Sequence, residues 1–126
     1  MAKLAELMSS KVFSVAPGDT LTEAAKAMVK GRVGSAMVVD GKWLLGILTE
    51  RDALRAAAAG AEPTVAKVKD WMTSDPVTAT PDTDVEEAAG MMAAGGFRHL
   101  PVVDGGGVVG VVSLRDLLST RIRKPS

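Results

Sequence analysis

The sequence repeats itself after 64 residues, and this internal duplication constrains the fold more than any other feature. When the chain is aligned with itself at that offset, residues 4–55 match residues 68–119 without a gap, and 16 positions are identical. One identical pair is Asp52 and Asp116. A unit of about 55 residues buries too little surface to be stable alone. We therefore predict two copies of one small unit that share a core.

The duplication also sets the expected domain organisation. We predict a first repeat at residues 4–59, a linker at residues 60–67 and a second repeat at residues 68–121, which together form one joint module. Of the 126 residues, 47% are hydrophobic and 24% are charged, as in soluble globular proteins. The chain shows neither a signal-peptide pattern at its start nor the about 20 consecutive apolar residues of a membrane span. We expect a cytoplasmic protein that does not associate with membranes.

Charge and residue usage exclude several classes of function. Lys and Arg together number 15, and so do Asp and Glu, which disfavours nucleic-acid binding by bulk electrostatics. Cysteine is absent and His99 is the single histidine, so thiolate catalysis, cysteine zinc sites and multi-histidine metal sites are excluded. Aromatic residues make up 3%, too few for a platform that stacks single-stranded bases. We expect no metal site and no nucleic-acid partner.

Each copy follows the same expected order: a short apolar stub, an extended segment, a helix, two strands and a second helix. Thr20 and Glu23 form a capping-box pattern at the start of the first helix, and Asp84 and Glu87 occupy the equivalent positions. Apolar residues then recur at helical spacing in both copies, at Leu21, Ala24, Ala25 and Met28 and at Val85, Ala88, Ala89 and Met92.

Gly31 and Gly95 mark the expected helix ends, and an Asp-Gly pair in each copy then predicts a β-hairpin. The strands are expected at residues 36–39 and 44–48 and at residues 100–103 and 108–112. Residues 105–110 also fit the G-x-G-x-x-G pattern, but a strand-like run follows instead of a helix, so we interpret them as a hairpin turn. This order predicts an α/β or α+β fold in which two small sheets pack together.

A hydroxyl residue precedes an aspartate by three positions at the start of the second helix in each copy. These pairs are Thr49 with Asp52 and Ser113 with Asp116. One interpretation is a plain helix N-cap. The other is a ligand site, because a carboxylate at such a turn accepts hydrogen bonds from a vicinal diol such as ribose, and the helix end favours phosphate. The residues alone leave both interpretations open.

The copies differ just before their first hairpin strand, where Arg98 and His99 stand in place of Gly34 and Ser35. An arginine can bind phosphate through two hydrogen bonds, and a solvated charge is the plain alternative. Ser113 and His99 could serve as nucleophile and base, but the sequence shows neither an oxyanion-hole motif nor a third orienting group. We expect no catalytic residues and no enzymatic activity.

Taken together, these motifs resemble a pair of CBS domains, also called a Bateman module. The resemblance covers about residues 4–119. In the first copy it rests on Leu4, Leu7 and Met8, on Val15, Pro17, Thr20 and Leu21, on residues 35–40, and on residues 46–49 with Asp52. In the second copy it rests on residues 70–73, 98–104 and 110–113 with Asp116. It implies tandem βαββα repeats related by a pseudo-twofold axis, with clefts for AMP, ADP, ATP, S-adenosylmethionine or NAD.

The resemblance also implies roles for single residues. Thr49 and Asp52 would contact ribose in one cleft, and Ser113 and Asp116 would do so in the other. Adenine would be held by the opposite copy, with Ala16, Val33 and Gly34 facing Asp116 and with Thr80, Phe97 and Arg98 facing Asp52. Arg98 and His99 resemble phosphate-side residues, so the two clefts should differ. No cofactor is required, and the adenine nucleotide is a regulatory ligand.

The resemblance further implies a stand-alone module without an attached enzyme, channel or transporter domain. Such a module would sense a nucleotide and signal through an unidentified protein partner or through its own dimer. The alanine-rich faces of the expected first helices are compatible with a homodimer. The alternative is a dimerisation or protein-interaction module that binds no small molecule.

Overall fold

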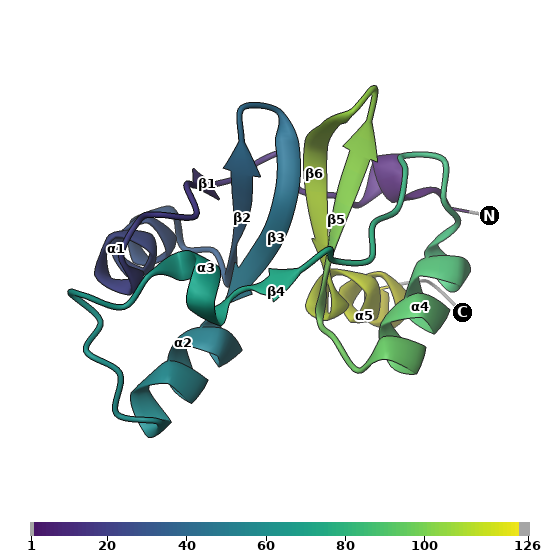
Figure 1. Cartoon of the computed structure of the whole chain (residues 1–126). Helices are drawn as coiled ribbons and strands as arrows, with labels where there is room; N and C mark the ends of the chain where they lie inside the picture. Colours follow the sequence, from purple (N-terminus) through teal and green to yellow (C-terminus); the bar gives the residue numbers. More distant parts are fainter. Residues whose placement is uncertain (1, 124–126) are drawn as a thin grey trace. The chain divides into compact units, whose positions relative to one another are not determined.

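The computed structural model describes residues 2–123 as an α+β protein (Figure 1). These residues form five α-helices, one short 3-10 helix and two small sheets. The chain divides into two compact units, each with its own apolar core. One unit spans Phe13–Pro76, and the other joins the N-terminal segment up to Val12 to the chain from Val77 onward.

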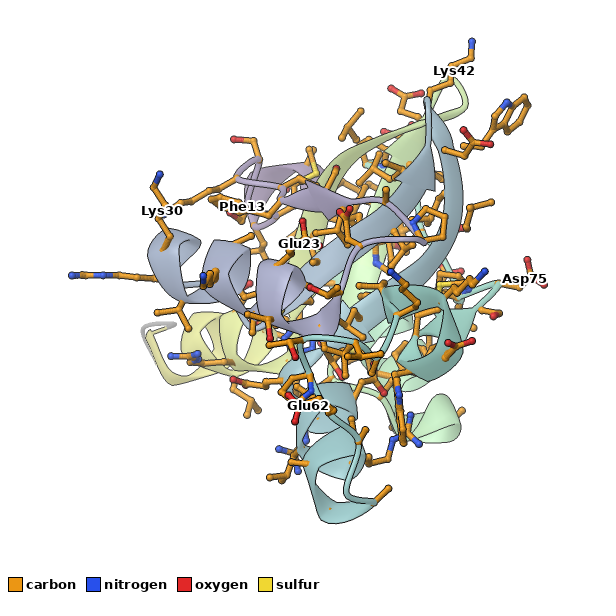
Figure 2. All side chains as sticks on the ribbon, turned by 60° about the vertical axis from the view of Figure 1, so that its left-hand side comes forward. Phe13, Glu23, Lys30, Lys42, Glu62 and Asp75 are labelled. Atoms are coloured by element: carbon orange, nitrogen blue, oxygen red, sulfur yellow. The ribbon has the colours of Figure 1, made fainter. Side chains whose placement is uncertain are left out.

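The Phe13–Pro76 unit contains a four-stranded sheet in the order β1-β2-β3-β4. Its elements in chain order are β1 (Ser14–Val15), α1 (Leu21–Gly31), β2 (Ser35–Asp40), β3 (Trp43–Thr49), α2 (Glu50–Ala58), α3 (Val68–Trp71) and β4 (Thr73–Ser74). β1 pairs with β2 in parallel, and the other pairs are antiparallel. Lys42 lies at the tip of the β2–β3 hairpin (Figure 2), next to Gly41, whose φ of 61° fits the Asp-Gly turn that the sequence predicts.

The second unit contains the β5–β6 hairpin, with α4 and α5 packed side by side (Figure 1). Its elements are the 3-10 helix η1 (Leu4–Glu6), α4 (Val85–Gly95), β5 (His99–Asp104), β6 (Gly107–Ser113) and α5 (Leu114–Arg123). Gly105 and Gly106 both have positive φ, 62° and 85°. Because a two-residue type I′ turn requires positive φ at both central positions, the glycine-rich segment is a hairpin turn.

The apolar stub of each repeat packs in the core of the other repeat. Leu4 is fully buried among residues from Val77 onward, and Val68 is fully buried in the Phe13–Pro76 core. The Leu4 N–H donates to the Thr83 carbonyl and the Val68 N–H donates to the Asp19 carbonyl, each at 2.9 Å. The compact units therefore differ from the sequence repeats by this exchange of stubs.

Glycines leave room for these stubs. A Cβ at Gly110 would lie 2.7 Å from the Met8 sulfur, and a Cβ at Gly46 would lie 2.7 Å from the Met72 sulfur. Real Cβ atoms do not approach a neighbour so closely, so a side chain at either position would push the stub away. Gly110 and Gly46, which are equivalent in the repeat, thus allow the equivalent methionines Met8 and Met72 to approach the strands closely.

The capping box predicted for the first repeat is confirmed. The Glu23 N–H donates to Thr20 Oγ1 at 3.2 Å, and the Thr20 N–H donates to Glu23 Oε1 at 3.0 Å. These bonds from the Thr20 backbone and hydroxyl hold the pKa of the Glu23 carboxyl below its usual value. α1 therefore begins where the sequence predicts.

The prediction of a second capping box, at Asp84 and Glu87, is wrong. Asp84 occupies the N-cap position of α4, but its side chain makes no capping hydrogen bond. Lys3 Nζ instead donates to Asp84 Oδ1 at 2.7 Å. This hydrogen bond lowers the pKa of Asp84 and raises the pKa of Lys3. A charged partner from the distant stub replaces the local cap.

Gly31 and Gly95 are the last residues of their helices, as predicted. Neither of them adopts the left-handed conformation that commonly follows a helix end. The left-handed residue is the next one along, Arg32 with φ 56° and Gly96 with φ 70°. A Cβ at Gly31 would overlap the Phe13 ring, and a side chain at Gly95 would overlap a ring in the same way.

The apolar stripes of the first helices are covered by their own units. Leu21, Ala24 and Met28 are buried in one core, and Val85, Ala88 and Met92 are buried in the other. Ala25 is exposed, and so is Val29 one turn further along α1. The buried members of these stripes are unavailable to a second copy, and the homodimer that we expected stays a prediction.

Candidate functional site

The Thr49 turn joins β3 directly to α2. Thr49 is the N-cap of α2, with extended backbone angles of φ −111° and ψ 165°. Its N–H donates to Asp52 Oδ2 at 2.9 Å, its hydroxyl lies 3.1 Å from the same oxygen, and the Asp52 N–H donates to Thr49 Oγ1 at 3.2 Å. The capping interpretation is thus correct as far as local structure goes.

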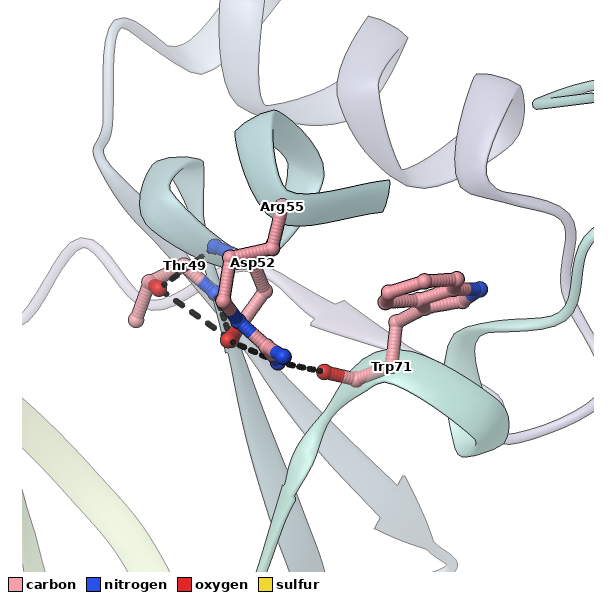
Figure 3. A network of polar contacts seen from close by, with 4 residues as sticks. All are labelled: Thr49, Asp52, Arg55 and Trp71. Carbon is pink, nitrogen blue, oxygen red and sulfur yellow. Dashed lines mark hydrogen bonds and ion pairs between the residues drawn. The ribbon is translucent and has the colours of Figure 1, made fainter. Parts of the chain in front are cut away.

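Asp52 differs from an ordinary capping residue in its burial. The residue is 5% exposed, whereas Glu23 in the matching box of α1 is exposed. Arg55 Nη2 donates to Asp52 Oδ1 at 3.1 Å and to the Trp71 carbonyl at 3.2 Å (Figure 3). Buried carboxylates need such partners, because a buried charge without them is costly. Arg55 is not among the site residues predicted from the sequence, because its spacing of three from Asp52 on a helix permits a contact but does not identify the partner.

The Ser113 turn repeats this geometry between β6 and α5. The Ser113 N–H donates to Asp116 Oδ2 at 3.0 Å, and the Asp116 N–H donates to Ser113 Oγ at 3.1 Å. Asp116 is half-buried, which leaves its carboxylate nearer to solvent than that of Asp52. The chain therefore builds the same hydroxyl–aspartate turn in each unit.

The start of the first hairpin strand lies beside each turn. The Gly34 carbonyl accepts from the Glu50 N–H at 3.0 Å, and the Arg98 carbonyl accepts from the Leu114 N–H at 2.8 Å. Across the strands, Ser35 pairs with Thr49, and in the other unit His99 pairs with Ser113. The structure thus brings Arg98 and His99 together with the Ser113–Asp116 turn, and Gly34 with the Thr49–Asp52 turn.

The remaining candidate residues lie in the same two units. The Ala16 N–H donates to Asp19 Oδ2 at 2.9 Å, and the Thr80 N–H donates to Thr83 Oγ1 at 3.1 Å. Ala16 and Thr80 are exposed at matched turns.

Val33 and Phe97 are half-buried and pack against their own cores. Ala16, Val33 and Gly34 therefore share a unit with Asp52, and Thr80, Phe97 and Arg98 share a unit with Asp116. The pairing across the two copies that we expected stays a prediction.

The charge around the two turns is unequal. Arg98 is exposed beside the Ser113–Asp116 turn, where a phosphate could reach it, and the equivalent residue beside the Thr49–Asp52 turn is Gly34. Helix N-termini at both turns add partial positive charge. Within residues 2–123, no group of three or more His, Asp or Glu side chains is placed to hold a metal ion.

Comparison with known proteins gives a consistent result. The family model of the CBS domain matches the chain twice, at residues 4–59 and 68–123. The CBS domain-containing protein YhcV of Bacillus subtilis is 35% identical over 127 residues, which is 100% of this chain and 90% of that protein.

Two solved structures bear on the site and on assembly. The CBS domain protein PAE2072 from Pyrobaculum aerophilum, complexed with AMP, has a TM-score of 0.82 and 30% identity over 90% of this chain and 88% of that chain. A hexameric CBS-CP12 protein from bloom-forming cyanobacteria has a TM-score of 0.90 and 27% identity over 100% of this chain and 76% of that one. In the part of the chain that the structure describes, no helix has the length and apolar character needed to cross a bilayer.

Proposed function

Because this chain belongs to the CBS domain family, we propose that it is a regulatory module that binds an adenosine-containing nucleotide at its two hydroxyl–aspartate turns. The observation that carries the proposal is the repeated geometry of Thr49 with Asp52 and Ser113 with Asp116, each at a strand end against a helix N-terminus. A carboxylate can accept from both hydroxyls of a ribose, and the helix end favours the attached phosphate. The AMP complex of PAE2072 supports this ligand class.

The ligand class is defined by its adenosine part. AMP, ADP and ATP fit it, and S-adenosylmethionine and NAD carry the same nucleoside. The nucleotide acts as a regulatory ligand rather than a cofactor, and the module has no catalytic role of its own. Both hydroxyls, of Thr49 and of Ser113, serve as acceptors in the helix caps.

A thermal-shift screen of these five compounds, with GMP as a control, tests the proposal. A ligand present at about 100 times its Kd adds roughly 2.7 kcal/mol to the free energy of unfolding, so the melting temperature should rise by several degrees. If no adenine compound raises the melting temperature at millimolar concentration, the proposed function is wrong.

Arg98 provides a separate prediction about phosphate. If its guanidinium binds the phosphate of the nucleotide, Arg98→Ala should weaken AMP binding by about 1.5–3 kcal/mol and leave adenosine binding nearly unchanged. Calorimetric titrations with both ligands measure the difference. Equal losses for adenosine and AMP would show that Arg98 has no phosphate role.

The exposed apolar surface supports a homodimer on different residues from those first considered. Leu54 on α2 is 71% exposed and Leu118 on α5 is 46% exposed, and the two leucines occupy equivalent positions of the repeat. A second copy that covers both would remove the apolar surface from water. The hexameric state of the CBS-CP12 protein supports the assembly of this chain.

We expect Leu54→Glu/Leu118→Glu to convert a dimer into a monomer in multi-angle light scattering at micromolar concentration. A glutamate would have to be desolvated in the interface. Val29→Glu is the matched control, because Val29 is 79% exposed on α1 and should not affect the mass. A monomeric unmodified protein would contradict the dimer and would leave signalling to an unidentified protein partner.

A further inference from the structure

Both oxygens of the Asp52 carboxylate already accept hydrogen bonds within the chain. Oδ2 accepts from the backbone and hydroxyl of Thr49, and Oδ1 accepts from Arg55 Nη2 at 3.1 Å. The bonds from Thr49 belong to the helix cap and hold the turn in shape. The bond from Arg55 is not part of the cap, and it lies on the carboxylate oxygen that the cap leaves for a ligand.

Arg55 is held over this carboxylate from two sides. Its Nη2 also donates to the Trp71 carbonyl at 3.2 Å, and its guanidinium carbon lies 5.7 Å from the centre of the Trp71 ring (Figure 3). The Arg55 side chain is 55% exposed, whereas the Asp52 side chain is 7% exposed. The guanidinium therefore lies partly in solvent beside a buried carboxylate, and it has room to turn away from it.

The sequence of the second repeat differs at both positions of this arrangement. The residue equivalent to Arg55 is Ser119, and the residue equivalent to Trp71 is Leu7. A serine cannot form an ion pair with a carboxylate, and a leucine offers no aromatic face to a cation. The Arg55 and Trp71 side chains are therefore particular to the Asp52 turn.

We propose that Arg55 is a latch on the Asp52 turn, and that it must turn into solvent before the diol of a nucleoside can bind there. The proposal rests on the proposed function and concerns the regulation of that same site. Arg55 is a positioning residue, because it acts on the ligand only through its hold on Asp52. Its hold on Asp52 lowers the affinity of this turn for the nucleotide.

The test isolates this turn by titrating adenosine into Asp116→Ala and into Asp116→Ala/Arg55→Ser. Adenosine carries no phosphate, so a lost contact between arginine and phosphate cannot disturb the comparison. The serine is the residue that the second repeat has at this position. We expect adenosine to bind about three- to tenfold more tightly to the doubly substituted protein, since a half-exposed ion pair contributes only modestly.

Salt provides a readout that a merely structural role of Arg55 would not change. Raising the ionic strength from about 0.05 to 0.5 M screens the Asp52–Arg55 pair, so the affinity of Asp116→Ala for neutral adenosine should rise, while that of the Arg55→Ser form should stay constant. Arg55→Lys keeps a cation and should restore most of the weaker binding. Trp71→Leu removes the ring but keeps the carbonyl, so it should raise the adenosine affinity by a smaller factor. This variant replaces Arg55→Ser in the test if Arg55→Ser does not fold.

Several outcomes would overturn the latch. Adenosine affinity that is unchanged or reduced in Asp116→Ala/Arg55→Ser would show that Arg55 does not compete with the ligand. Equal salt dependence with and without Arg55 would do the same. If the unmodified protein binds nucleotide and only Arg55 proves irrelevant, the latch alone fails, whereas loss of all nucleotide binding to the unmodified protein rejects the proposed function together with it.

Discussion

Leu4→Ala is expected to destabilise the unit built around β5 and β6 by about 2–5 kcal/mol, although Leu4 belongs to the first repeat in sequence. The residue is fully buried with Leu100, Val102 and Val112. The substitution would leave a cavity in that core. Hydrogen exchange should therefore show the larger loss of protection in β5 and β6, and a smaller one in β2 and β3.

Val68→Ala is the mirror-image control for this prediction. Val68 is fully buried in the Phe13–Pro76 core, so its truncation should act mainly on β2 and β3. If Leu4→Ala instead loosens β2 and β3 more than β5 and β6, the exchange of stubs between the units is wrong.

Asp52→Ala and Glu23→Ala are expected to have similar effects on stability, but only Asp52→Ala is expected to weaken nucleotide binding. Each removes the acidic member of a capping box, which typically costs about 1 kcal/mol. The hydrogen bonds within the two boxes are nearly the same in length. Asp52→Ala should also weaken AMP binding at its turn by about tenfold or more, because hydrogen bonds to a charged group contribute about 1.5–3 kcal/mol.

Thermal unfolding gives the stability of both variants, and calorimetry gives their affinity for AMP. Glu23→Ala should bind as the unmodified protein does. Equal affinity of all three proteins would leave Asp52 with a capping role only.

Much of the fold could be predicted because its signals are local. The Asp-Gly pairs determine the hairpins, and both hairpins were placed within one residue at each end. The Thr20 box and the ends of α1 and α4 were also correct. In each case the deciding contact lies within a few residues of the signal, where helical or strand periodicity is reliable.

The errors come from contacts that are distant in sequence. Lys3 and Asp84 lie 81 positions apart, and nothing near Asp84 indicates that an ammonium group replaces its cap. The apolar pattern of the stub shows that Leu4 is buried but not in which core. The buried stripe of α1 lies in one core with residues of β1, β2 and β3, and the helical pattern does not show which elements cover it.

The candidate site shows the same division. Thr49 with Asp52 and Ser113 with Asp116 could be identified from the repeat, and their hydrogen bonds are those of a capping box. Arg55 could not be assigned to Asp52 from sequence alone, because its second partner is a backbone carbonyl on α3. Backbone acceptors carry no sequence signal, and this one depends on how α3 packs against α2.

The most direct test of the central claim is a calorimetric titration of AMP into the unmodified protein and into Asp52→Ala/Asp116→Ala. Circular dichroism should first show that the variant is folded, since two lost caps cost about 2 kcal/mol together. We predict saturable binding to the unmodified protein and no measurable binding to the variant. An affinity for AMP that survives both substitutions unchanged would contradict the assignment of the hydroxyl–aspartate turns as the nucleotide site.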